Sequence, residues 1–181
     1  LYPKALAYLK DVIDSKTNHL ESDYQKMWYN MNNLVTTTGG ETIFSFPFDD
    51  NRGRWNFTFA GLSDAASISS NVKRGGEGGP VPTLWFDYDS EDIRRDLSCI
   101  NYKWNKDDSI EPSGIDTWYF GKYRFNWMVA QPYGGGNDDG IKPVVMRYSD
   151  ILLMAAEIEN ELGHLDEAKA YLLEVRSRAF P

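Results

Sequence analysis

Apolar residues recur at intervals of three and four positions near the C-terminus, which is the spacing of one helix face. The first run consists of Ile151, Leu152, Met154, Ala155, Ile158 and Leu162. A second run follows and consists of Ala168, Leu172, Val175 and Ala179. Gly163 stands between the runs, where a helix can end in a left-handed turn. The pattern predicts a helical hairpin over residues 142–181, with Asp150 and Asp166 as the N-caps of its two helices.

The start of the chain repeats the spacing of the second run, at Ala5, Leu9 and Val12. We therefore expect a helix over Tyr2–Ser15. In the hairpin, the small side chains of Ala156 and Ala168 would let two antiparallel helices approach closely, as in tetratricopeptide repeats. The fold predicted is mainly α, with tetratricopeptide-like helix pairs. Because the first helix of the earlier pair is not found, we interpret the chain as a fragment that begins inside a hairpin, with an apolar helix face that has lost its partner.

Between these helices, in residues 34–141, the helical spacing is lost. A helix over Ser22–Asn33 is expected just before this region, so that residues 1–33 are helical. Glycine-rich runs at residues 75–80 and 134–140 are typical of loops. A loop-rich region of this length is usually either functional or disordered, and its many aromatic residues argue against disorder. We expect a single domain in which this loop-rich region forms the ligand side.

Short elements are expected within the loop-rich region. Glu41–Phe48 alternates in the manner of a short strand. A short helix is expected around Trp85–Tyr88. The aromatic content of Leu97–Trp104 and of Thr117–Trp127 is typical of strands.

Several stretches match a known family, in sequence and in order. The longest is Val145–Glu157, which reads VMRYSDILLMAAE, and it is followed by Asn160–Gly163 and Val175–Ala179. Shorter matches precede it, at Asp23–Tyr24 with Trp28, at Gly40–Phe44 and at Asp92–Asp96. With these motifs the chain resembles the SusD/RagB family over nearly its whole length, in the order that the family has them.

The resemblance implies both a function and a location. Members of the family are cell-surface lipoproteins of Bacteroidetes that bind glycans and sit on a SusC-like TonB-dependent transporter. It therefore implies a SusD-like fold and a protein that captures an oligosaccharide or polysaccharide at the outer membrane. It also implies attachment to the membrane through a lipid anchor that this fragment lacks. Neither an enzymatic activity nor a cofactor is expected.

Composition and charge narrow the possible partners. The 181 residues are 41% hydrophobic and 25% charged, as in ordinary globular domains. A formal net charge of −8 argues against nucleic acid as a partner. No apolar run reaches the ~18 residues that a membrane-spanning helix needs. Cys99 is the single cysteine and cannot form a disulfide within the chain.

Aromatic residues are the strongest sign of a binding site. The chain has 6 Trp, 11 Tyr and 9 Phe, many of them in loop-like segments. Their flat rings can stack on the C–H faces of sugars while polar neighbours bind the hydroxyl groups. The best candidate is Trp55, which belongs to no apolar period. Its polar neighbours are Arg54, Asn56, Arg52 and Asp49. The alternative is that Trp55 packs on the body of the protein.

A second set of candidate ligand residues consists of Trp104, Trp118 and Tyr119, for which packing in the core or in strands is the favoured alternative. Trp28 and Trp85 are expected in the core, because Trp28 lies on an apolar helix face and Trp85 in a segment that matches the family.

Other chemistry is weakly indicated. Asp87, Asp89 and Glu91 have the opening spacing of a calcium loop, but the required glycine is missing and no metal is expected. Neither His19 nor His164 has a second ligand at a usable spacing. Two other functions stay open: a tetratricopeptide-type scaffold that binds proteins, and, less favoured, a glycoside hydrolase with a pair of carboxylates.

Overall fold

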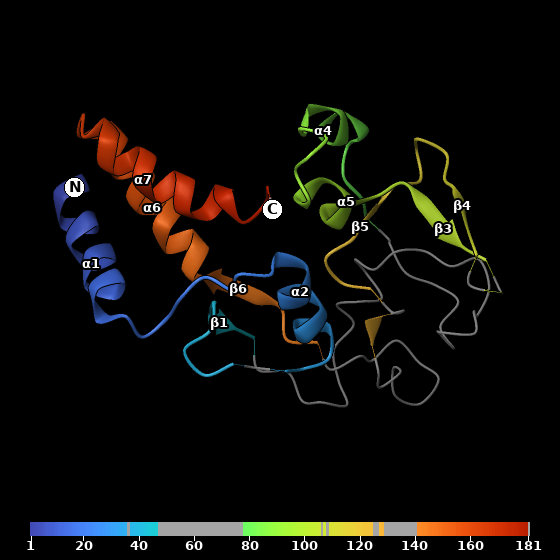
Figure 1. Cartoon of the computed structure of the whole chain (residues 1–181), viewed down its shortest axis with the longest axis horizontal. Helices are drawn as coiled ribbons and strands as arrows, with labels where there is room; N and C mark the ends of the chain where they lie inside the picture. The colour runs from blue at the N-terminus through green and yellow to red at the C-terminus, as the bar shows by residue number, and fades with distance from the viewer. Residues whose placement is uncertain are drawn as a thin grey trace. The chain divides into compact units, whose positions relative to one another are not determined.

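The structure is a computed structural model that describes residues 1–35, 37–46, 78–105, 107, 109–124, 127–128 and 141–180. The chain divides into two compact units. The first consists of Leu1–Tyr24, Thr36–Phe46 and Val144–Pro181. The second consists of Gln25–Val35 and Pro47–Pro143. Figure 1 labels the elements along the chain.

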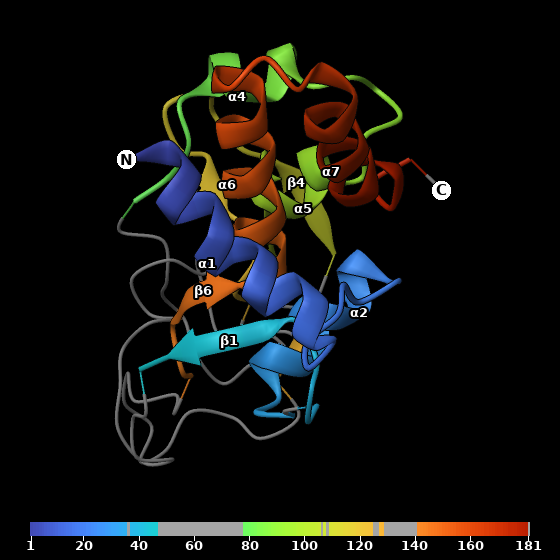
Figure 2. The same ribbon diagram turned by 90° about the vertical axis from the view of Figure 1, so that its left-hand side faces the viewer.

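The first unit is built on α6 (Tyr148–Glu161), which packs against α7 (Leu165–Ser177) and against α1 (Tyr2–Ser15) (Figure 2). Leu152 and Ala155 are fully buried on α6. Each belongs to one of two apolar clusters, whose buried members are Leu6, Ala155 and Ile158 in one and Tyr148, Leu152 and Val175 in the other. The mainly α fold with tetratricopeptide-like helix pairs is confirmed.

The predicted close crossing of α6 and α7 is confirmed by the burial of its small residues. Ala156 is 8% exposed and Ala168 is 9% exposed. Gly163 has φ +84° and follows the end of α6. Its N–H donates to the Asn160 carbonyl, and the His164 N–H donates to the Glu159 carbonyl at 2.8 Å. These two bonds form a Schellman motif, which turns the chain into α7.

The bounds of α1 agree with the prediction, but the expectation that its apolar face lacks a partner is wrong. Ala5, Leu9 and Ile13 pack against the buried cluster of Leu6, Ala155 and Ile158, so that α6 covers this face. On the rest of the helix, Tyr2 and Tyr8 are 46% and 62% exposed.

Both predicted N-caps are wrong. The helix α6 begins at Tyr148 with Arg147 as its N-cap, because β6 (Val144–Arg147) runs into it without a loop. Asp150 is the third residue of the helix, and its carboxylate accepts the Arg147 backbone N–H at 2.7 Å. The N-cap of α7 is His164, so Asp166 lies in the first turn. There its charge is favourable toward the helix dipole.

A two-stranded antiparallel sheet pairs β1 (Thr42–Ser45) with β6. The predicted strand was longer, and its last two residues lie outside the described ones. Thr42 is opposite Arg147, and the Tyr148 N–H donates to the Glu41 carbonyl at 2.7 Å. The pairing therefore fixes Glu41 at the start of α6.

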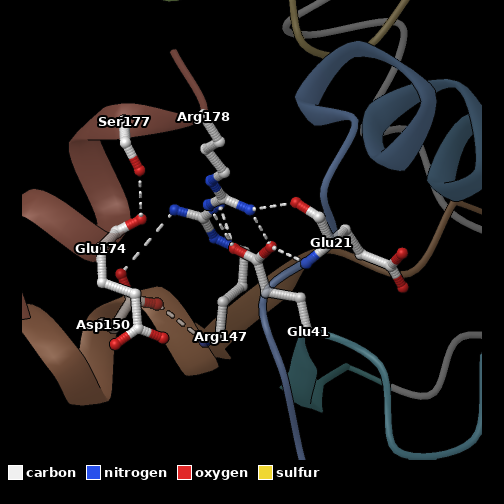
Figure 3. A network of polar contacts seen from close by, with 7 residues as sticks. All are labelled: Glu21, Glu41, Arg147, Asp150, Glu174, Ser177 and Arg178. Atoms are coloured by element: carbon white, nitrogen blue, oxygen red, sulfur yellow. Dashed lines mark hydrogen bonds and ion pairs between the residues drawn. The ribbon is translucent and has the colours of Figure 1, made fainter. Parts of the chain in front are cut away.

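Glu41 is the centre of a buried ion-pair network (Figure 3). Its side chain is fully buried, and Arg147 Nη1 donates to Oε1 at 3.1 Å. Arg178 Nη2 donates to the same oxygen at 2.8 Å, and its Nη1 donates to Oε2. Arg178 also donates to the Glu21 carbonyl at 3.0 Å. Three motif segments of the sequence thus meet at one carboxylate, which gives these motif residues a structural role.

The second unit contains most of α2 (Tyr24–Asn32) and several shorter elements. These are α4 (Pro82–Asp87), α5 (Arg94–Ser98), β2 (Cys99–Ile100), β3 (Tyr102–Trp104), β4 (Ile110–Pro112) and β5 (Tyr119–Phe120). Antiparallel pairs join β2 to β5 and β3 to β4. The prediction of strand from Leu97 is wrong at its start, because Leu97 and Ser98 close α5.

The core of the second unit includes Trp28, which is 4% exposed, as predicted. Its ring meets the Tyr123 ring edge-on, with centroids 5.5 Å apart. Asn32 joins α2 to the segment after β5. Its amide donates to the Lys122 carbonyl at 2.9 Å, and its side-chain oxygen accepts the Arg124 N–H at 2.7 Å. Among the described helices, none is long and apolar enough to cross a membrane.

Candidate functional site

Three aromatic rings gather on the second unit: Trp85, Phe86 and Trp118, which we call the aromatic platform. The ring centroids of Trp85 and Phe86 lie 5.2 Å apart, and those of Trp85 and Trp118 lie 5.9 Å apart. Both pairs meet edge-on, whereas Phe86 and Trp118 are tilted by 39° at 6.0 Å. Contacts of this kind fix aromatic rings relative to one another.

Two chain segments are brought together to form the platform. Trp85 and Phe86 are consecutive residues of α4, which starts at Pro82, a residue suited to the first turn of a helix. Trp118 directly precedes β5. The segment before α4 touches it through Gly79, where an added Cβ atom would lie 1.8 Å from the Trp118 carbonyl oxygen. Only glycine allows this approach.

The platform is accessible. Phe86 is 64% exposed, and its apolar neighbours Val81 and Leu84 are 68% and 41% exposed. Trp85 and Trp118 are partly buried. A gathering of large exposed apolar side chains is typical of an interaction site.

Polar groups border the Trp85 ring. Its Nε1 donates to Asp96 Oδ1 at 3.1 Å. Arg95 donates to both oxygens of Asp96, at 3.0 Å each, and its guanidinium lies 4.6 Å from the Trp85 ring centroid. The hydrogen bond from Arg95 lowers the pKa of Asp96, which therefore stays ionised at neutral pH. Since the Asp96 carboxylate is 64% exposed, it can still accept hydrogen bonds from a ligand.

A buried arginine supports this border. Arg124 is 7% exposed, and burial lowers its pKa. Its Nη2 donates to the Asp96 carbonyl at 3.0 Å, and its Nε donates to the Gly121 carbonyl. Arg124 thus holds the backbone of Asp96, whose side chain accepts the hydrogen bond from Trp85.

A second aromatic pair lies on β3. The rings of Tyr102 and Trp104 are 5.2 Å apart and meet edge-on. The register of the hairpin places Trp104 opposite Ile110, which is 60% exposed. Tyr102 and Trp104 are two positions apart in the strand and therefore lie on the same face. Lys103 lies between them in sequence and forms an ion pair with Glu111 at 2.9 Å.

The predicted ligand residues fall into four groups. Trp118 belongs to the platform and Trp104 to the β3 pair. Tyr119 is 8% exposed and contributes to the core. The preferred set lies outside the described residues and stays a prediction: Trp55, Arg54, Asn56, Arg52 and Asp49.

Sequence reasoning missed most of the platform. The prediction that Trp85 lies in the core is wrong, because the six-residue α4 has no buried residue. Arg95 and Asp96 lie in the segment Asp92–Asp96, which matches the family, and neither is among the predicted ligand residues. The one available signal was the run Trp85-Phe86-Asp87, which places two adjacent rings on a helix too short to bury both.

Among the described residues, no group of three or more His, Cys, Asp or Glu could hold a metal ion.

Comparisons with known proteins agree with this fold. A SusD homologue from Bacteroides thetaiotaomicron is 22% identical with a TM-score of 0.77, over 99% of this chain and 40% of that protein. Surface glycan-binding protein A from the same species, in complex with laminarihexaose, is 23% identical with a TM-score of 0.71, over 99% and 43%. A SusD superfamily protein from Parabacteroides distasonis is 17% identical with a TM-score of 0.70, over 98% and 38%.

The chain thus spans about two fifths of the length of these solved structures. A search of curated proteins finds no match. The family model described as the SusD family matches residues 23–181, so the chain belongs to the SusD family.

Proposed function

We propose that this protein binds oligosaccharides or polysaccharides at the cell surface without cleaving them, and that the aromatic platform is one of its contact surfaces. The observation that carries the proposal is the set of three rings, with Phe86 exposed and Trp85 and Trp118 partly buried, beside the Arg95–Asp96 pair. The rings offer flat apolar area, and the pair offers hydrogen-bond donors and acceptors to sugar hydroxyls. Stacking with hydrogen bonds gives moderate affinity, which suits capture followed by release.

The relatives support the same proposal. One of them is a surface glycan-binding protein in complex with laminarihexaose. We propose by analogy that this protein acts at the outer membrane, is held there by a lipid anchor, and passes its ligand to a SusC-like TonB-dependent transporter. The analogy rests on family membership and not on the platform itself.

A second function is favoured by a separate observation on α7. Leu165, Leu172 and Leu173 are 64%, 48% and 48% exposed. Apolar side chains on the outside of a helix pair are typical of tetratricopeptide-type scaffolds that bind other proteins. Binding of a protein at α7 is compatible with binding of a glycan at the platform, so each needs its own test.

The test is calorimetric titration of the purified protein with a panel of oligosaccharides, with product analysis after long incubation. We expect binding without cleavage, and Trp85→Ala and Trp118→Ala should each weaken it about tenfold or more. Tyr8→Ala is the matched control, because Tyr8 is an exposed ring in the first unit, and it should leave the affinity unchanged. Cleavage would favour a glycoside hydrolase, and absence of binding to any glycan would favour the scaffold.

A further inference from the structure

We propose that the aromatic platform selects uncharged glycans and disfavours polysaccharides that carry carboxylate or sulfate groups. The inference rests on the proposed function and names the ligand class of the same site. Its basis is the distribution of charge around the three rings.

The segment that carries the platform is acidic. Residues 82–98 contain five carboxylates and two guanidiniums, which leaves three negative charges in excess. The five carboxylates are those of Asp87, Asp89, Glu91, Asp92 and Asp96. A further carboxylate, that of Asp116, lies two positions before Trp118. Both sequence segments of the platform thus bring acidic groups with them.

The two arginines of the segment are already paired. Arg94 donates through Nε to Asp92 Oδ1 at 2.9 Å and through Nη2 to Oδ2 at 2.5 Å. Arg95 donates to both oxygens of Asp96, and its guanidinium lies over the Trp85 ring. Its pKa is raised by the hydrogen bond to Asp96 and, to a smaller degree, by the charge of Asp89. An anionic ligand would therefore have to compete with carboxylates that hold both cations.

Three further carboxylates near the platform in the sequence are unpaired among the described residues. Asp87, Glu91 and Asp116 are exposed and form no ion pair with any residue that the structure describes. Asp87 directly follows Phe86 of the platform. Because Asp87 and Phe86 are adjacent residues of α4, the charge of Asp87 lies within the screening length, about 10 Å at 0.1 M salt, of a ligand on that ring. An anionic sugar stacked on Phe86 or Trp85 would thus be repelled, whereas a neutral sugar would meet acceptors for its hydroxyl groups.

The experiment compares matched pairs of ligands. Each pair is a neutral glucan, laminarin or soluble starch, and the same polymer oxidised at C6 to the carboxylate. Binding is measured in 50 mM NaCl with EDTA, so that divalent cations cannot bridge carboxylates. We expect the neutral member to bind at least tenfold more tightly. In 1 M NaCl, where the screening length is about 3 Å, the difference should shrink to about threefold or less.

Variants connect this preference to the named carboxylates. Asp87→Asn with Asp89→Asn and Glu91→Gln should tighten binding of the oxidised polymer about tenfold and leave binding of the neutral polymer unchanged. The control is Glu157→Gln with Glu161→Gln and Glu167→Gln, which removes the same charge from exposed positions on α6 and α7. This control variant should not change the ratio of the affinity for the neutral polymer to that for the oxidised polymer.

The results that would overturn the inference alone differ from the result that would also overturn the proposed function. Equal or tighter binding of the oxidised polymer in 50 mM NaCl, with dependence on Trp85, would overturn the inference and leave the proposed function standing. A preference for neutral polymer that the first triple variant does not alter would also overturn it. If no member of either pair binds and no other glycan does, the proposed function fails, and the inference fails with it.

Discussion

Arg178 donates to both carboxylate oxygens of Glu41, although 137 positions separate the two residues in the chain. The carboxylate is fully buried and receives a third bond, from Arg147. A charge in such a place is tolerated only because it is paired and hydrogen-bonded. Glu41 and its two arginines therefore join the start of β1, the start of α6 and the chain after α7.

The first prediction concerns this carboxylate. Burial alone would raise the pKa of Glu41, but the hydrogen bond and charge of Arg178, followed by the charge of Arg147, lower it overall. Glu41→Gln leaves the buried guanidinium of Arg178 and the partly buried guanidinium of Arg147 without their acceptor charge, and should cost about 3–5 kcal/mol of unfolding free energy at pH 7. Urea unfolding measures this, and Glu157→Gln, at an exposed position of α6, should change the value by less than about 0.5 kcal/mol.

The lowered pKa also sets the pH dependence. A carboxyl group with a lowered folded-state pKa contributes stability above its unfolded value of about 4.3, and loses it as pH falls through the folded value. The difference between the wild-type protein and Glu41→Gln should therefore be complete at pH 6–8 and shrink below about pH 4. A difference that stays constant down to pH 3 would show that Glu41 does not act through its charge.

The network illustrates which features are visible in the sequence. The bounds of α1 and the burial of Ala156 and Ala168 could be predicted, because helical periodicity and residue size are local properties. The partners of Glu41 could not, because they depend on strand pairing over about a hundred positions. The N-cap at Arg147 was missed for a related reason. Asp150 has the residue type of a cap, but β6 runs directly into the helix and makes it the third residue.

The second prediction tests the helix crossing. Ala168→Leu adds a branched side chain where Ala168 is 9% exposed, and should cost about 1–3 kcal/mol through overpacking. Ala170→Leu makes the same change on the exposed side of α7 and should leave stability within about 0.5 kcal/mol of the wild type. Thermal or urea unfolding compares the two. Equal effects would mean that α6 and α7 do not approach closely at Ala168.

The third prediction concerns the contact between α1 and α6. Lys10 Nζ lies 2.7 Å from Glu159 Oε1, and His164 Nδ1 lies 2.6 Å from Oε2. The hydrogen bond from Lys10, then that from His164, lowers the pKa of Glu159. Lys10→Met should cost about 1–2 kcal/mol, less than for a fully buried pair, because Lys10 is 45% exposed and His164 remains.

This effect should also depend on pH. The contribution of Glu159 is present above its unfolded pKa of about 4.3 and is lost as pH falls through the lowered folded value. The cost of Lys10→Met should therefore fall below about pH 4. Lys169→Met, at an exposed position of α7, is the control and should show little cost at any pH. A cost that grows in acid would contradict the assignment.

The fourth prediction concerns Trp55, which lies outside the described residues. If it contacts ligand, Trp55→Ala should weaken glycan binding by about 1–3 kcal/mol, a magnitude known for aromatic stacking on nucleobases. Unfolding free energy should change much less. Calorimetric titration and urea unfolding of the same variant separate the alternatives. Unchanged affinity with a loss of about 3–5 kcal/mol in stability would identify a core tryptophan.

The platform was only partly foreseen for physical reasons. Trp118 was a candidate because of its aromatic character, but nothing local indicates that α4 would lie against it. The match of its segment to the family predicts a core position for Trp85. Two contacts bring these segments together: the ring of Trp85 meets that of Trp118, and Gly79 approaches the Trp118 carbonyl closely.

The last prediction tests that approach with two neighbouring glycines. A Cβ atom at Gly79 would lie 1.8 Å from the Trp118 carbonyl oxygen, so Gly79→Ala must push the segment before α4 away from Trp118. A Cβ atom at Gly78 would meet only the Phe120 ring, at the ordinary distance of 3.7 Å. Gly79→Ala should therefore weaken glycan binding by about as much as Trp118→Ala, and Gly78→Ala should leave it unchanged. Titration of both variants, with tryptophan fluorescence to follow the ring environment, makes the comparison. If Gly79→Ala alters the fluorescence but not the affinity, the platform forms as described and the ligand binds elsewhere.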